Sequence, residues 1–221
     1  MISPTKNTAL VSLLAEVVDP IGPHPVVYHR APGTKDGTGT PLRPAAVLFP
    51  LTYRNNQLQA ILTVRNQSLR NHPGQISFPG GKADQADSDV AATAMREAFE
   101  ELGILQQDVA VIGALETCTT GTGFSIVPVL GIIPPHYPYR IDRAEVEEVF
   151  HVPLDYLMDD ARHQRLRRLF NGSPQEYFAI DYEKYHIWGA TARMIVGLHG
   201  RLGGKHATPR FKKLFSICDN A

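Results

Sequence analysis

The chain has 221 residues, of which 43% are hydrophobic and 20% are charged, a composition that is ordinary for a globular protein. Its 22 basic and 22 acidic residues cancel, so no overall field attracts nucleic acid or an anionic membrane. No stretch reaches the roughly 18 apolar residues of a membrane span, and the N-terminus lacks the basic start and apolar run of a signal peptide. These features predict a cytoplasmic protein without nucleic-acid or membrane partners.

The first half of the chain is predicted to contain one helix and one β-hairpin. Apolar residues recur at helical spacing from Thr8 to Val18, which predicts an amphipathic helix. The segment from Pro20 to Pro44 is rich in proline and glycine and is predicted to be a loop. Two apolar runs, Ala45–Thr52 and Leu58–Arg65, are separated by turn-forming residues and predict a hairpin.

The rest of the chain mixes strands with helices. We expect a short strand within residues 71–81, a helix over Ser88–Leu102, and strands within 109–118 and 125–134. Residues 145–160 predict a strand that passes into a helix. Residues 176–202 predict a strand, a turn and a closing helix that begins at about Gly189. This pattern predicts a single α/β or α+β domain over residues 41–200. It lies between an N-terminal extension, residues 1–40, and a C-terminal tail, residues 201–221.

The predicted helix over Ser88–Leu102 carries three glutamates on one side. At 100° per residue Glu97, Glu100 and Glu101 lie within about 100° of arc. The opposite, apolar face consists of Ala91, Ala94, Met95, Ala98, Phe99 and Leu102. We expect the apolar face to contact a sheet and the glutamates to project away from it. The glutamates then form either a solvated acidic stripe or a cation site.

Three neighbouring features favour a cation. Pro79-Gly80-Gly81 predicts a sharp turn whose backbone can approach a ligand, and Gly103 fixes the end of the helix. Arg96 can pair with Glu100 one turn later, which leaves the other carboxylates free. Oxygen ligands on a rigid element suit Mg²⁺ or Mn²⁺, which would hold the like charges together.

Residues 81–104 resemble the Nudix box, G-x5-E-x7-R-E-U-x-E-E-x-G-U, in which U is aliphatic. The segment REAFEELGI, residues 96–104, matches each specified position when Ala98 is accepted as U. In the first half Asp87 stands in place of glutamate, and one extra residue precedes Arg96. The resemblance implies a Nudix fold, a mixed β-sheet between α-helices, and metal-dependent hydrolysis of a nucleoside diphosphate linked to another group.

The resemblance extends upstream of the box. The segment ILTVRNQSLRNHPGQISFPGG, residues 61–81, is similar to the LLTxRSxxxRxxxGxVxFPGG signature of coenzyme A pyrophosphatases. It implies hydrolysis of coenzyme A or a derivative to 3′,5′-ADP and 4′-phosphopantetheine. Two alternatives stay open: a Nudix pyrophosphatase acting on ADP-ribose or a dinucleotide, and a nucleotide-sensing module without catalysis.

The resemblance also implies roles for the residues of the box. Glu97 and Glu101 are expected to be the principal ligands of Mg²⁺ or Mn²⁺, and the Gly81 carbonyl can add an oxygen. Glu100 is expected to be a third ligand or the partner of Arg96. Together with Arg96, the three glutamates form the expected catalytic set.

Substrate contacts are expected from the upstream signature. Arg65 and Arg70, with the backbone of Gly80 and Gly81, are candidates for holding the phosphates, because arginine binds phosphate through two hydrogen bonds. The alternative for both arginines is an ion pair that ties the signature loop to the acidic helix.

Two further predictions stay open. Glu145 and Glu148 are candidates for the general base, and a solvated strand end is the alternative for each. The N-terminal helix could contact its own domain or a second subunit, so a homodimer is neither predicted nor excluded.

Overall fold

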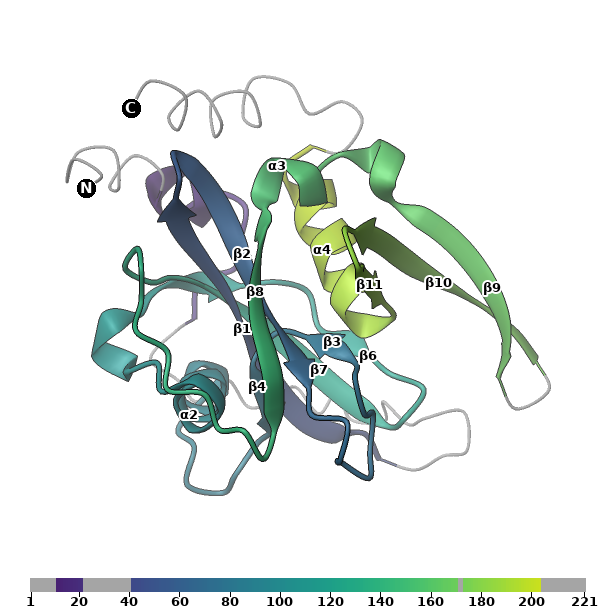
Figure 1. The fold of residues 1–221 in the computed structure, drawn as a ribbon, viewed down its shortest axis with the longest axis horizontal. Helices are drawn as coiled ribbons and strands as arrows, with labels where there is room; N and C mark the ends of the chain where they lie inside the picture. Colours follow the sequence, from purple (N-terminus) through teal and green to yellow (C-terminus); the bar gives the residue numbers. More distant parts are fainter. Residues whose placement is uncertain (1–10, 22–40, 171–172, 204–221) are drawn as a thin grey trace.

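The computed structural model describes residues 11–21, 41–170 and 173–203 (Figure 1). An eight-stranded mixed sheet lies between helices, and a second, three-stranded antiparallel sheet stands beside it. The predicted mixture of strands and helices is therefore confirmed. Among the described residues, no helix is long and apolar enough to cross a membrane.

The central hairpin forms where the two apolar runs predict it. Strand β1 (Arg43–Arg54) pairs antiparallel with β2 (Gln57–Arg65). Asn55 and Asn56 form the two-residue turn, with φ angles of 52° and 58°. Such a turn needs positive φ at both positions, which asparagine tolerates better than most residues.

The hairpin is the middle of the large sheet. Strand β7 (Phe124–Ile132) runs parallel to β1 on one side, and β8 (Val146–Pro153) runs antiparallel to β2 on the other. The remaining strands are short: β3 (Ile76–Ser77), β4 (Gly80–Lys82), β5 (Ala110–Ala114) and β6 (Cys118–Thr119).

Strand β4 corrects the predicted Pro-Gly-Gly turn. Gly80 pairs with Val47 and Gly81 pairs with Ala46, so this segment is extended and hydrogen-bonded to β1. A Cβ on Gly80 would collide with the backbone of Ala46 and Val47. Glycine is needed here for the close approach of two strands, and not for a reversal of the chain.

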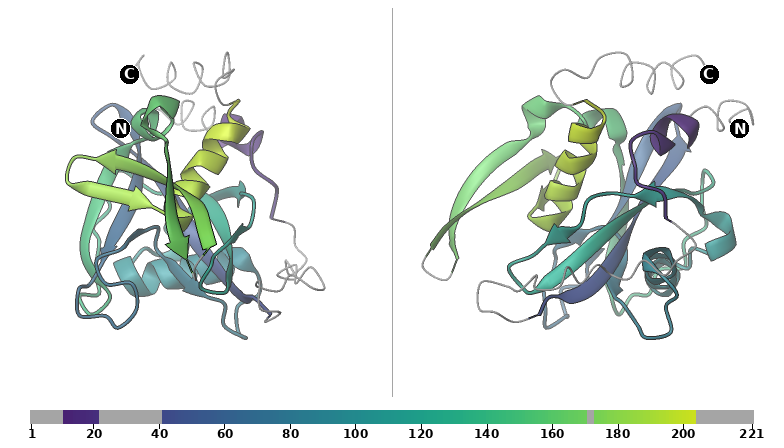
Figure 2. Two further views of the ribbon diagram at one scale, coloured as in Figure 1. Left: turned by 90° about the vertical axis from the view of Figure 1, so that its right-hand side faces the viewer. Right: turned by 180° about the vertical axis from the view of Figure 1, so that it is seen from behind.

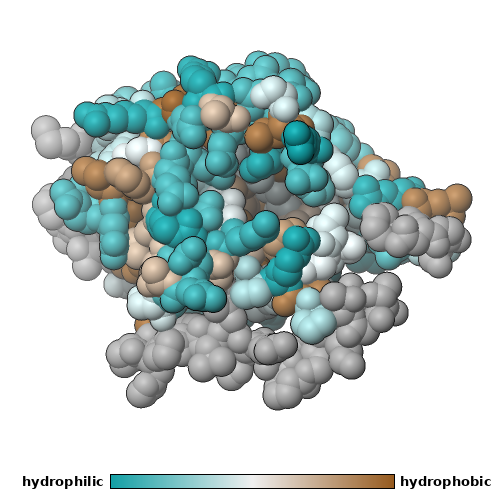
Figure 3. Space-filling view, turned by 90° about the horizontal axis from the view of Figure 1, so that it is seen from below, coloured by the Kyte–Doolittle hydropathy of each residue, from teal (hydrophilic) through white to brown (hydrophobic). Residues whose placement is uncertain are grey.

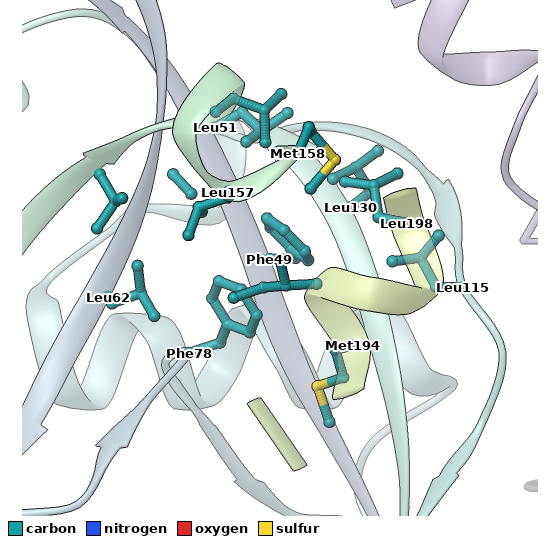
Figure 4. Close-up of a cluster of buried hydrophobic side chains, with 14 of the residues drawn as sticks. Phe49, Leu51, Leu62, Phe78, Leu115, Leu130, Leu157, Met158, Met194 and Leu198 are labelled. Atoms are coloured by element: carbon teal, nitrogen blue, oxygen red, sulfur yellow. The ribbon is translucent and has the colours of Figure 1, made fainter. Parts of the chain in front are cut away.

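The two faces of the sheet carry separate hydrophobic clusters because strand side chains alternate. On one face Ala46 and Leu48 pack against α2 (Val90–Leu102). On the other face Phe49 and Leu51 belong to a larger cluster, part of which is drawn in Figure 4. That cluster also contains residues of α3 (Leu154–Leu157) and α4 (Ala190–Arg201).

The second sheet contains three strands, and the sequence predicted only the middle one. Strand β9 (Gln164–Phe170) pairs with β10 (Ser173–Tyr182), which pairs in turn with β11 (Tyr185–Trp188). The far ends of β9 and β10 extend away from the body of the molecule (Figure 2). The predicted closing helix, α4, follows directly at Gly189. Two 3₁₀ helices, Gln106–Asp108 and Asp160–Arg162, complete the described elements.

The described part of the N-terminal extension packs on its own domain. Residues 11–15 are helical, and Leu14 is fully buried in the larger cluster. Asp19 pairs with Ala114 through an isolated β-bridge and accepts a hydrogen bond of 2.9 Å from Arg201. Most of the predicted loop over Pro20–Pro44 and most of the C-terminal tail lie outside the described residues.

Candidate active site

Helix α2 positions the acidic residues. A side chain caps its N-terminus, and a backbone amide caps its C-terminus. The Asp89 side chain accepts a hydrogen bond of 2.8 Å from the Ala92 amide, so the helix begins two residues later than predicted. Gly103 ends it in the left-handed region, at φ 68°, where its amide donates to the Phe99 carbonyl.

The face of α2 that meets the sheet differs from the prediction at two residues. Phe99 is 52% exposed, whereas Glu101 is only 3% exposed. The predicted apolar residues other than Phe99 are buried. The buried arc is thus rotated towards the glutamates, and the prediction that all three project away from the sheet is wrong for Glu101.

Glu101 is a buried carboxylate with an unsatisfied oxygen. Its Oε2 is buried and has no hydrogen-bond partner. Burial raises the pKa of Glu101 to about 8, because it penalises the ionised form more than the nearby charge of Arg65 and a backbone hydrogen bond from Gly80 favour it. An unpaired buried carboxylate is costly, so this group needs either a proton or a cation.

Glu97 lies one turn before Glu101 and is close to β4. A Cβ on Gly81 would overlap the Glu97 carboxylate, so this carboxylate lies directly against the glycine backbone. Burial raises the pKa of Glu97, and the charges of Glu100 and Glu145 act in the same direction. Arg96 opposes them through a hydrogen bond of 2.8 Å.

Arg96 holds the acidic residues in place. Its Nε and Nη2 donate to the two oxygens of Asp87, at 3.0 Å each, and Nη2 also donates to the Lys82 carbonyl. Its Nη1 donates to Glu97 at 2.8 Å and to Glu100 at 3.3 Å. The predicted Arg96–Glu100 pair is confirmed, but the contacts with Asp87 and Glu97 are shorter.

Asp87 is the residue whose role the sequence did not reveal. Its side chain is 6% exposed, and the hydrogen bonds from Arg96 lower its pKa to about 2. The Thr93 hydroxyl also donates to it, at 2.7 Å. The only signal in the sequence was an acidic residue displaced within the box. Its pairing with an arginine nine positions later depends on the path of the loop before α2.

The two candidate general bases, Glu145 and Glu148, have different surroundings in the structure. Glu148 accepts hydrogen bonds from Lys184 and from the Tyr185 hydroxyl, at 2.7 Å for the latter, so it has a structural role at the second sheet. Glu145 is exposed, and its charge raises the pKa values of both Glu97 and Glu101. Of the two, Glu145 has the charge that acts on the glutamates of α2.

The two signature arginines lie at the end of β2 and in the loop that follows it. Arg65 is half-buried at the end of β2, and its charge lowers the pKa of Glu101. Arg70 is exposed in the loop that follows β2. Within the described residues neither arginine forms an ion pair, so the predicted tie between this loop and α2 is not observed there. This loop lies at the lower end of the molecule in Figure 1, and the face seen from below carries mainly hydrophilic residues at its centre (Figure 3).

The donor set fits a hard divalent cation through two carboxylates. In the described part of the chain, no three His, Cys, Asp or Glu side chains are already gathered as a metal site. Glu100 is 57% exposed on its side chain, against 16% for Glu97, so it is the least enclosed of the three predicted ligands. Glu97 and Glu101 supply hard oxygens, one of them buried and unpartnered. Mg²⁺ commonly takes only one or two protein carboxylates and completes its shell with water and substrate phosphate.

We expect Gly81→Ala to weaken metal binding without unfolding the protein. The added Cβ overlaps the end of the flexible Glu97 side chain, which can move away at little cost to stability but loses its position. Affinity for Mn²⁺, measured by electron paramagnetic resonance, should fall by about 10- to 100-fold. The thermal unfolding midpoint should change by only a few degrees, and an unchanged Mn²⁺ affinity would contradict the placement of Glu97.

Comparison with known proteins identifies the family of this chain. Residues 41–171 match the family model of the NUDIX domain. The chain is 42% identical over 163 residues to a protein called "Uncharacterized Nudix hydrolase NudL" from Escherichia coli (strain SMS-3-5 / SECEC), covering 74% of this chain and 84% of that protein. The protein of the same name from Shigella boydii serotype 4 (strain Sb227) matches with the same identity and coverage.

A solved structure shares the fold at low sequence identity. The MutT/nudix family protein from Enterococcus faecalis superposes with a TM-score of 0.50 at 14% identity, covering 81% of this chain and 74% of that one. The family model matches more than half of the chain, and the relatives are similar over most of their own length. The chain therefore belongs to the Nudix family, and it is a hydrolase that acts on pyrophosphate bonds.

Proposed function

We propose that this hydrolase cleaves the diphosphate bond of coenzyme A or a coenzyme A derivative, giving 3′,5′-ADP and 4′-phosphopantetheine. The observation that carries the proposal is the position of the upstream signature: its Gly81 lies directly against the Glu97 carboxylate, and the charge of its Arg65 acts on the buried Glu101. The segment that resembles coenzyme A pyrophosphatases is thus next to the acidic helix. Fold and box alone would fit many diphosphates.

Nudix hydrolases generally need divalent metal ions, and we propose Mg²⁺ or Mn²⁺ for this chain. Glu97 and Glu101 would hold the ion, with the Gly81 carbonyl and Glu100 as further oxygen donors. A bound divalent ion neutralises charge on a diphosphate and lowers the pKa of water. Arg96 acts on this site as a positioning residue. Asp87 holds its guanidinium, which in turn orients Glu97 and Glu100 through hydrogen bonds.

The other residues of the site have separate tasks. Arg65 and the exposed Arg70 offer forked donors to substrate phosphates, and the exposed Glu145 is our candidate for accepting the proton of the attacking water. The backbone of Gly80 and Gly81 is our further candidate for a substrate contact, because Gly81 lies directly against Glu97.

The proposal predicts hydrolysis of coenzyme A in the presence of Mg²⁺ or Mn²⁺ and none with a chelator. Dephospho-coenzyme A lacks the 3′-phosphate, so its kcat/KM should be about 10- to 100-fold lower, the usual worth of a charge-assisted hydrogen bond. A panel of diphosphates that includes ADP-ribose and dinucleotides, followed by chromatography of the products, tests this. Faster turnover of ADP-ribose or a dinucleotide would favour the rival substrate class.

An arginine variant tests the origin of that preference. Arg70→Ala is expected to reduce the ratio of the two kcat/KM values, because Arg70 is exposed and has no ion pair among the described residues. Arg162→Ala is the matched control, since Arg162 is also exposed but pairs with Asp159 away from the site. A preference for coenzyme A that survives in Arg70→Ala would exclude Arg70 as the phosphate contact.

A further inference from the structure

A cavity lies on the α2 side of the sheet, and its lining contains none of the acidic residues of α2. It has a volume of about 330 Å³ and is lined by Arg54, His136, Tyr137, Tyr139 and His151, with two aliphatic side chains. Arg54 comes from the end of β1, His151 comes from β8, and the other three belong to the segment between β7 and β8. None of the residues of the candidate active site lines it.

The polar end of the cavity, at Arg54 and His151, is separated from Arg65 along β8. Arg65 pairs with Val146 at one end of this strand, whereas Ile61 pairs with His151. Five residues of extended chain correspond to about 17 Å. The polar groups at His151 are therefore distant from Arg65, whereas Ile141, at another part of the lining, precedes Asp142, whose amide donates to the Glu101 carbonyl.

The hydrogen bonds around His151 leave a donor free in the cavity. Arginine can only donate, so Arg54 Nη1, at 3.5 Å, makes Nδ1 of His151 the acceptor. Burial and the charge of Arg54 lower the pKa of His151 to about 4, so the ring is neutral at neutral pH and its proton is on Nε2. Nε2 then donates to the Tyr139 oxygen, 3.3 Å away, and the hydroxyl hydrogen of Tyr139 stays available.

The charges that face the cavity favour an anion. No aspartate or glutamate is among its lining residues in the described chain. The nearest acidic group linked to the lining, Asp108, accepts the hydrogen bond of Tyr137 at 2.7 Å, and the Tyr137 oxygen accepts from the Leu105 amide. The free donors are therefore the remaining N–H groups of Arg54 and the hydroxyl of Tyr139, set between aromatic walls.

We propose that this cavity is a binding site for a small oxyanion, a phosphate or carboxylate group carried by a small molecule with a planar ring. Arg54 binds the anionic group, Tyr139 donates a second hydrogen bond, and the rings of Tyr137, Tyr139 and His151 contact the body of the ligand. This site is independent of the pyrophosphatase reaction, because it shares no residue with it.

The test is a titration of the metal-free, full-length protein with inorganic phosphate, phenyl phosphate and benzoate, followed by ¹H–¹⁵N NMR spectra. We expect saturable shifts at the amides of His136, Tyr139 and His151, with a ring-bearing anion binding more tightly than phosphate. The tighter of phenyl phosphate and benzoate identifies the anionic group. Shifts at the amides of Glu97 and Glu101 report binding at the candidate active site. The test can therefore refute one proposal without refuting the other.

Variants of Arg54 decide the assignment. Arg54→Ala should weaken binding by about tenfold or more, and Arg54→Lys by less, because lysine keeps the charge and loses the forked geometry. Arg167→Ala, at an exposed arginine of β9 that pairs with Glu176, should bind as the wild type does. Absence of saturable shifts with all three anions, or equal affinity of Arg54→Ala and wild type, would overturn the proposal.

Discussion

Replacing Glu101 with glutamine is expected to lower kcat/KM for coenzyme A by about 10²- to 10³-fold, because a metal ion contributes several kcal/mol to such reactions. Glu101 is the buried carboxylate with an unpartnered oxygen, and the neutral amide of glutamine offers less charge to a divalent cation than a carboxylate does. Steady-state assays with saturating Mg²⁺ and Mn²⁺ measure the effect. Glu100→Gln should lose less activity, since Glu100 is exposed and bonded to Arg96.

Glu101→Gln is expected to change activity and stability in opposite directions. Since burial raises the pKa of Glu101 to about 8 from 4.5, the unfolded chain ionises first as pH rises. The metal-free wild type then loses stability between about pH 4.5 and 8, and a neutral glutamine does not. Metal-free Glu101→Gln should therefore be at least as stable as wild type near pH 8. Glu176→Gln, on β10, is the control for activity, and an active Glu101→Gln enzyme would refute the metal-ligand assignment.

Asp87→Asn is expected to destabilise the protein by about 2 kcal/mol at neutral pH and to lower its Tm by about 4–8 °C. The reason is the forked pair with Arg96, which lowers the pKa of Asp87 from 3.8 to about 2 in a side chain that is 6% exposed. Urea unfolding of both proteins measures the difference. Loss of the pair also frees Arg96, so activity should fall as Glu97 loses its orientation.

The pH dependence of this difference has a defined sign. A lowered folded-state pKa stabilises the protein fully above the unfolded value of 3.8, and the contribution disappears as pH falls through about 2. The gap between wild type and Asp87→Asn should therefore close between about pH 5 and pH 2. Asp159→Asn is the matched control: its pair with Arg162 is about half exposed and should contribute less than about 1 kcal/mol. Equal effects of the two substitutions would contradict the buried-pair interpretation.

Local signals explain the elements that were predicted well. The Asn55–Asn56 turn between two apolar runs predicts the hairpin because both residues tolerate positive φ. Gly103 predicts the end of α2 for the same reason. Strand β9 was not predicted, because it is a charged sequence, QRLRRLF, with little of the alternation that marks a half-buried strand.

The sequence identified the residues of the Nudix box, but the structure changed the predicted placement of Glu101. The spacing of Arg96, Glu97 and Glu101 identifies the box, but helical spacing alone placed Glu101 opposite the sheet. The side of α2 that becomes buried depends on how the helix is rotated against β1 and β4, which no local pattern reports. The role of Asp87 was missed for a similar reason.

The sequence by itself determined the family, the presence of the hairpin and of α2 with the end of α2 at Leu102, and the glutamates that we propose for the site. These follow from contacts between near neighbours and from motif spacing, which are properties of short segments. Only the tertiary structure decided that Glu101 is buried, that Asp87 pairs with Arg96, and that the charge of Glu145, rather than that of Glu148, acts on the glutamates of α2. Burial and charge coupling arise between segments far apart in the chain, so they exist only once the sheet and α2 are packed together.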